Sequence, residues 1–111
     1  MHIVSAKIQM DNARREKTIA EHKQIINSLD LKNVKSKISS MEAIAGGDKD
    51  LLAEIKKQDE YEALVEYQTE YDLQNEQLAT EITMHDQEIE AYQKLQDEGI
   101  NAATTFWCFG G

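Results

Sequence analysis

The chain has 111 residues, of which 30% are charged and only 6% are aromatic, and it contains no proline. Twelve basic against 21 acidic residues give a net charge of -9, which argues against nucleic acid as a partner because phosphate binding needs clustered Lys and Arg. No stretch approaches the roughly 20 apolar residues of a membrane span, so no such span is expected. This composition suits elongated helices with a narrow apolar seam better than a compact globular core.

The first predicted element is a mildly basic helix over residues 1–45. Its residues have good helix propensity, and the first interior glycines follow at Gly46-Gly47. Polar turn formers cluster at Asn27-Ser28-Leu29-Asp30. A kink near 27–33 is therefore an open alternative to a continuous helix.

A turn over residues 46–49 and an acidic helix over residues 50–98 are predicted next. Gly46 is suited to a left-handed cap at the end of the first helix, and Asp48 or Asp50 to capping the start of the second. Gly99 is expected to end the second helix, so that residues 99–111 form a separate, uncharged hydrophobic tail.

The charges divide between the two helices. Residues 1–47 carry a net charge of +3 and residues 48–111 a net charge of -12. A short connection makes neighbouring helices antiparallel, so the predicted fold class is all-α: an antiparallel two-helix hairpin with coiled-coil character and an apolar C-terminal tail. Folding about Gly46-Gly47 pairs residues whose numbers sum to about 95 and predicts four ion pairs: Lys7–Glu88, Arg14–Glu81, Lys23–Asp72 and Lys35–Glu60.

The second helix has a heptad pattern with polar insertions, which is typical of a coiled coil. One line of positions holds Leu64, Tyr71, Leu78, His85 and Tyr92, and the other holds Tyr61, Gln68, Asn75, Ile82 and Ile89. Because a misaligned partner would leave them unpaired, Gln68, Asn75 and His85 are predicted to specify the register.

The first helix offers a less regular seam, with Ile19, His22, Ile26 and Leu29 followed by Val34, Ile38, Met41 and Ala45. The five-residue step from Leu29 to Val34 shifts its phase at the place where a kink is considered. Further apolar residues lie off the seam of the second helix and need another surface: Leu52, Val65, Tyr67, Leu73 and Met84.

The tail carries no charge and contains the only Trp and the only Phe residues of the chain. Burying one such side chain stabilises by roughly 1.5–3 kcal/mol, so the tail is expected to dock on a protein surface. The predicted interface residues are Ile100, Phe106, Trp107, Cys108 and Phe109.

No catalytic, cofactor-binding or metal site is predicted. The three histidines, His2, His22 and His85, show no metal-ligand spacing such as HExxH. Cys108 has no basic neighbours to stabilise a thiolate, and is interpreted as a small buried apolar residue.

The size, the helical plan and the low cysteine content resemble those of type III secretion needle and filament subunits, over most of the chain but without a shared motif. The needle-type Pro-containing turn is missing, and the turn Ala43-Ile44-Ala45-Gly46-Gly47-Asp48 lacks the Trp-x-Gly of secreted WxG-type proteins. Prefoldin-like subunits are similar in shape alone.

The sequence thus predicts a non-enzymatic structural subunit that self-assembles through helical packing and tail docking, into a filament or ring. Its expected partner is a second copy of the chain. The alternative is a helical chaperone or adaptor that binds the helices of another protein. A cytoplasmic location is the default, and export without a cleaved signal stays open.

Overall fold

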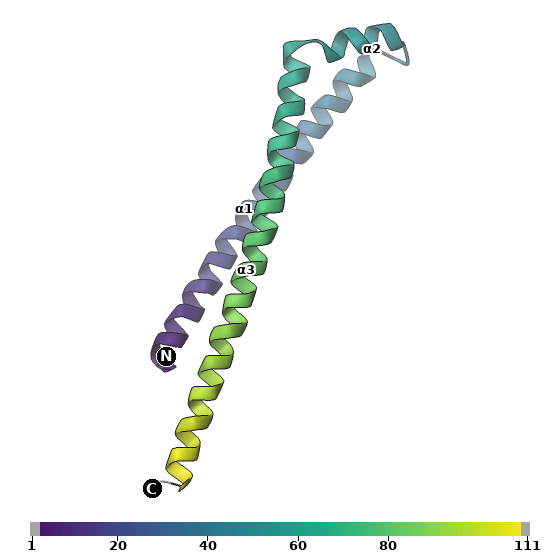
Figure 1. Ribbon diagram of the computed structural model, residues 1–111. Coiled ribbons are helices and arrows are strands. Elements are labelled where there is room, and N and C mark those ends of the chain that lie inside the picture. The colour runs from purple at the N-terminus through teal and green to yellow at the C-terminus, as the bar shows by residue number, and fades with distance from the viewer. Residues whose placement is uncertain (1–2, 110–111) are drawn as a thin grey trace. The chain divides into compact units, whose positions relative to one another are not determined.

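The computed structural model describes the backbone of residues 3–109 and the side chains of residues 5–99. This part of the chain is helical throughout, with no strand, and the all-α prediction is confirmed for it. Figure 1 shows the three helices: α1 (Ile3–Ile44), α2 (Lys49–Lys56) and α3 (Asp59–Phe109).

α1 runs through residues 27–33 as one helix without a break. Asn27 explains why. Its side chain is 5% exposed and bonds across to α3, and a side chain committed to that contact does not compete for the backbone of its own helix.

The glycine turn has the predicted conformation. Gly46 and Gly47 have φ angles of +57° and +90°, a region that L side chains rarely adopt. The carboxylate of Asp48 accepts from the N–H groups of Asp50 and Leu51 at 2.9 and 3.3 Å, which makes Asp48 the N-cap of α2.

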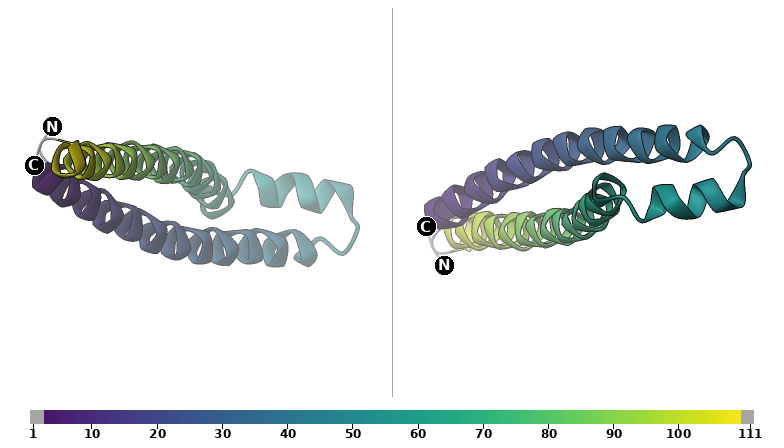
Figure 2. Two further views of the ribbon diagram at one scale, coloured as in Figure 1. Left: turned by 90° about the horizontal axis from the view of Figure 1, so that it is seen from below. Right: turned by 90° about the horizontal axis from the view of Figure 1, so that it is seen from above.

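The single helix expected over residues 50–98 is divided into α2 and α3 by a break at Lys57-Gln58 (Figure 2). At about 100° per residue, a straight helix would place Ile55 roughly opposite Leu64, nine positions later. The break instead lets both residues enter one core, where Ile55 is 4% and Leu64 9% exposed. Burial of Ile55 is the physical reason for the extra helix boundary.

α3 also continues past Gly99, which the sequence analysis placed at its end. Gly99 is helical, and no proline follows to stop the helix. A glycine inside a helix costs about 1 kcal/mol relative to alanine, a penalty that the helix-forming Ala102-Ala103 helps to offset.

The chain forms two compact units. Unit 1 combines Met1–Glu21 with Ala79–Gly111, and unit 2 is His22–Leu78. The core of unit 2 is a cluster from all three helices, with Met41, Leu52 and Tyr71 packed against it: Val34, Ile38, Ala45, Ile55, Tyr61 and Leu64. Unit 1 buries smaller α1 side chains: Ala6, Met10, Ala13 and Ala20.

The seam predicted for the first part of α1 is wrong. Ile19, Ile26 and Leu29 are 43%, 60% and 56% exposed, and His22 is exposed as well. The buried positions of α1 are spaced three, four or seven residues apart, and they include Ala20, Asn27 and Val34. Ala20, Asn27 and Val34 lie on the same side of the helix as Ile38 and Ala45, and no five-residue step is needed to connect them. The buried side of the first part of α1 is therefore the side that continues into its apolar C-terminal part.

Candidate functional site

A buried amide pair joins α1 to α3 inside unit 2. The Asn27 side-chain nitrogen donates to the side-chain oxygen of Asn75 at 2.6 Å and to the backbone oxygen of Tyr71 at 2.8 Å. Both contacts satisfy the amide nitrogen of the buried Asn27, which would otherwise lack a partner. Asn75 was expected to specify register. Asn27 was not identified, because its place in a cluster of turn formers suggested a local role.

The positions that the heptad pattern selected on α3 are all buried or half-buried, although several neighbouring positions are half-buried too. Tyr61 and Leu64 are buried, and those that follow are half-buried: Gln68, Tyr71, Asn75, Leu78, Ile82, His85, Ile89 and Tyr92. Gln68 thus shares the inward side of α3 with Asn75.

His85 lies in unit 1 with both ring nitrogens buried and without a hydrogen-bond partner among the described residues. Its Nε2 is 3.5 Å from a Glu81 carboxylate oxygen and its Nδ1 is 3.7 Å from that of Glu88. Both carboxylates come from α3 itself, one turn before and one turn after the ring. The two glutamates are the ionic partners of the imidazolium form.

A second cross-helix contact in unit 2 joins the last turn of α1 to the first turn of α3. The Tyr61 hydroxyl donates to the Glu42 carboxylate at 2.9 Å. This hydrogen bond raises the pKa of Tyr61, because it favours the protonated phenol, and burial and the nearby negative charge act in the same direction.

An ion pair joins α1 and α3 inside unit 1. The Lys17 Nζ lies 2.6 Å from an Asp86 carboxylate oxygen. The hydrogen bond to Asp86 raises the pKa of Lys17, since it stabilises the ammonium form. Both side chains remain partly exposed, at 31% and 48%, so the pair orients the helices more than it stabilises them.

The observed contacts follow a different register from the one expected. Folding about Gly46-Gly47 would place Lys17 near residue 78, but it pairs with Asp86. Tyr61 likewise contacts Glu42 instead of a residue near 34. The four predicted ion pairs are not formed among the described residues, and the shift of about eight positions arises because α2 lengthens the connection between α1 and α3.

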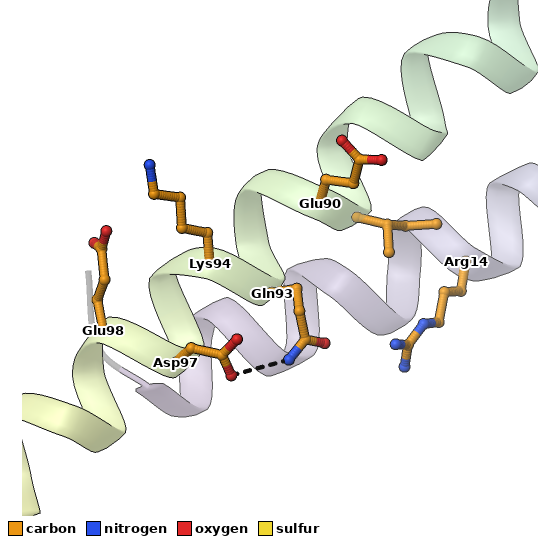
Figure 3. A pocket seen from close by; sticks show the side chains of 7 residues that line it. Arg14, Glu90, Gln93, Lys94, Asp97 and Glu98 are labelled. Carbon is orange, nitrogen blue, oxygen red and sulfur yellow. Dashed lines mark hydrogen bonds between the residues drawn. The ribbon is translucent and has the colours of Figure 1, made fainter.

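Unit 1 has an open hollow of about 640 Å³ lined by Arg14 of α1 and by residues of α3. Figure 3 shows the ends of Lys94 and Glu98 pointing away from Arg14, and a hydrogen bond from Gln93 to Asp97 at 3.1 Å. The charged groups of the hollow do not converge on one point, whereas a site that binds a small molecule directs its polar groups toward the ligand.

The tail residues predicted as an interface lie outside the described side chains: Ile100, Phe106, Trp107, Cys108 and Phe109. Their backbone belongs to α3, which ends at Phe109. Within residues 5–99, no group of three or more His, Cys, Asp or Glu side chains is placed to hold a metal ion. Among the described helices, none combines the length and the apolar character needed to cross a membrane.

Comparison with known proteins gives no relative: no protein-family model, curated protein or solved structure matches the chain.

Proposed function

We propose that this chain is a non-enzymatic structural subunit that self-assembles into a filament or ring. In this proposal α1 and α3 form an antiparallel hairpin of coiled-coil character. The heptad spacing of buried and half-buried residues on α3 supports the hairpin, as do the cross-helix contacts of Lys17 and Asn27. Helical packing and docking of residues 100–109 on a second copy hold the assembly together.

The observation that carries the proposal is the imbalance between buried and exposed apolar side chains. Apart from alanines, six hydrophobic residues are buried in the described part of the chain, whereas twelve large ones are exposed. Ile8, Ile25 and Ile44 are between 54% and 70% exposed. In this proposal the exposed apolar side chains form the interaction surface, because burying each of them would be worth about 1.5–3 kcal/mol.

The composition of residues 99–111 also supports the proposal. This segment has no charge and holds Phe106, Trp107 and Phe109, in a chain of which 30% is charged. Aromatic side chains supply most of the binding energy in many interfaces, so in this proposal these three residues are the anchors.

Removal of residues 104–111 tests the proposal. The full chain should grow in size with concentration, as measured by light scattering and sedimentation velocity. The shortened chain should keep its helical circular dichroism signal but stay small at every concentration, because its aromatic anchors are gone.

A full-length chain with Thr104→Ser and Thr105→Ser is the matched control, since it alters the same segment but keeps the aromatic residues. It should assemble as the unaltered chain does. A shortened chain that forms the same oligomer as the full chain would refute tail docking, and a full chain that stays monomeric at all concentrations would refute self-assembly.

A second candidate function is a helical chaperone or adaptor. The charge of α3 favours it, because this helix contains thirteen acidic residues and one lysine. The net charge of +3 on α1 is too small to balance this negative charge. A basic helical partner would balance it. Concentration dependence separates the two functions, because an adaptor should remain a small closed oligomer until its partner is added.

A further inference from the structure

Unit 1 has exposed apolar residues on both of its helices. Ile8 and Ile19 on α1 are 54% and 43% exposed, and Met84 and Leu95 on α3 are 53% and 39% exposed. On α1 these residues lie opposite the buried positions, and on α3 they lie about a quarter turn to one side of the half-buried heptad positions, where the Glu88 side chain is still 45% exposed. One charged residue lies between each pair on the same side, namely Arg15 on α1 and Glu88 on α3.

We call Ile8, Arg15 and Ile19 the outer face of α1, and Met84, Glu88 and Leu95 the outer face of α3. Steps of four, seven and eleven residues return to nearly the same side of a helix. Each outer face is therefore a narrow line with an apolar residue at both ends, about 16 Å apart along the axis, and one charge between them.

The two outer faces have matching spacing when the helices are antiparallel. The steps along α1 are seven and then four residues, whereas those along α3 are four and then seven. Read in opposite directions, they bring Ile8 beside Leu95 and Ile19 beside Met84. The same alignment brings the positive Arg15 beside the negative Glu88.

Charge selects this pairing over the pairing of two identical faces. α3 holds thirteen acidic residues and one lysine, so two α3 helices would repel each other. α1 is the helix with a net positive charge, at eight basic against five acidic residues. An α1 face of one copy is thus the complementary occupant for an α3 face of another.

We propose that the outer face of α1 in one copy packs antiparallel on the outer face of α3 in a second copy. This inference rests on the proposed self-assembly and specifies the surface used. Because the two faces differ, two copies joined by one contact keep one free face of each kind: the α3 face of the first copy and the α1 face of the second. Repetition of the contact then extends the assembly or closes it into a ring.

Two charge reversals test the pairing. Arg15→Glu places two negative charges in the contact, and Glu88→Arg places two positive charges there. At low ionic strength, where charges are least screened, each variant alone should need about threefold to tenfold more protein to assemble than the unaltered chain.

An equal mixture of the two variants provides the decisive measurement. In alternating order, Glu at position 15 of one chain meets Arg at position 88 of the other, and the second type of contact keeps the original Arg15–Glu88 pair. Assembly in the mixture should return to within about twofold of the unaltered chain. Recovery in the mixture also separates the contact from any effect of Glu88 on the nearby His85, since that effect would persist.

Lys7→Glu and Glu90→Arg are matched controls, because they make the same charge changes at exposed positions of the same helices outside the outer faces. They should not reproduce both the loss in each variant alone and the recovery on mixing. Circular dichroism checks that every variant stays helical.

Two results would overturn the pairing while leaving self-assembly intact. In one, the single reversals assemble as the unaltered chain does; in the other, the mixture assembles no better than its components. An unaltered chain that does not grow with concentration would instead refute the proposed function itself, before any variant is compared.

Discussion

At the scale of single residues, a cross-helix amide pair joins α1 to α3 in unit 2. Asn27 is the one buried polar residue among the described side chains, and its amide bonds both Asn75 and the Tyr71 backbone. Amide pairs of this kind add little stability compared with apolar pairs, but other alignments leave them unpaired. We therefore expect the pair to favour the register in which both amides are bonded.

Asn27→Ala should lower the free energy of unfolding by about 1–3 kcal/mol, because it leaves the Asn75 side-chain oxygen without its donor and removes the additional bond to the Tyr71 carbonyl. Urea unfolding followed by circular dichroism measures this loss. The exposed Asn33→Ala serves as the control and should change stability by no more than about 0.5 kcal/mol. Equal effects at the two positions would contradict the role given to Asn27.

Tyr61→Phe should remove part of the alkaline pH dependence of stability. The pKa of Tyr61 is raised in the folded chain, chiefly by its hydrogen bond to Glu42. Its contribution is fully present below the pKa of an unfolded tyrosine, about 10, and is lost as the pH rises through the higher folded value.

Thermal unfolding of both chains between pH 8 and 11 measures the effect. The stability difference between the unaltered chain and Tyr61→Phe should shrink above about pH 10. Tyr67→Phe, at an exposed position, is the control and should show no such trend. A difference that stays constant over the whole range would exclude the Tyr61–Glu42 hydrogen bond as a source of pH dependence.

At the scale of helices, α2 shows how one buried residue divides an otherwise continuous helical stretch. Asp48 is the N-cap of α2, and at its other end the N–H groups of Lys57 and Gln58 donate to the carbonyls of Glu54 and Ile55. Three acidic residues in the first turn of α3 then favour a new helix start through the helix dipole. These local signals allow a break between α2 and α3, and the break lets Ile55 pack into the core of unit 2.

Ile55→Ala should destabilise the chain by about 2–4 kcal/mol, because Ile55 is 4% exposed and its removal leaves a cavity between α1 and α3. Chemical unfolding is the measurement. Ile44→Ala makes the same chemical change at a side chain that is 70% exposed, and should cost no more than about 0.5 kcal/mol. If Ile55→Ala proved as mild as Ile44→Ala, the core of unit 2 would not depend on α2.

At the scale of the whole molecule, the two units have cores of different size. Unit 2 buries branched and aromatic side chains, including Ile38, Ile55 and Tyr61. Unit 1 buries Met10 and three alanines on α1, and its α3 residues are half-buried at best. Because burial of apolar surface is the main source of stability, the local free energy of opening should be larger in unit 2.

Amide hydrogen exchange should show this difference within α1 alone. Residues 22–44 should exchange more slowly than residues 5–21 after correction for intrinsic rates. The reason is that opening of residues 22–44 exposes the larger core, that of unit 2. Mass spectrometry of peptic fragments from a dilute, unassembled sample gives both rates. Equal protection along α1 would mean that the two units open together.

Helix content and the inward side of α3 follow from the sequence alone. The absence of proline, the two interior glycines and the repeated heptad from Tyr61 to Tyr92 require only local geometry, because a helix returns to the same side every seven residues whatever its neighbours are. The glycine turn is equally local, since only glycine reaches the φ angles of Gly46 and Gly47 at low cost.

The buried side of α1, the break before Asp59 and the register between helices were decided by tertiary contacts. Two lines of positions on α1 have a helical period, one through Ile19 and Ile26 and one through Ala20 and Asn27, and hydrophobicity alone favours the wrong one. A period fixes which residues share a side but not which side meets a partner. That choice depends on packing against α3, on the burial of Ile55 and on the cross-helix bond of Asn27, none of which exists before the helices meet.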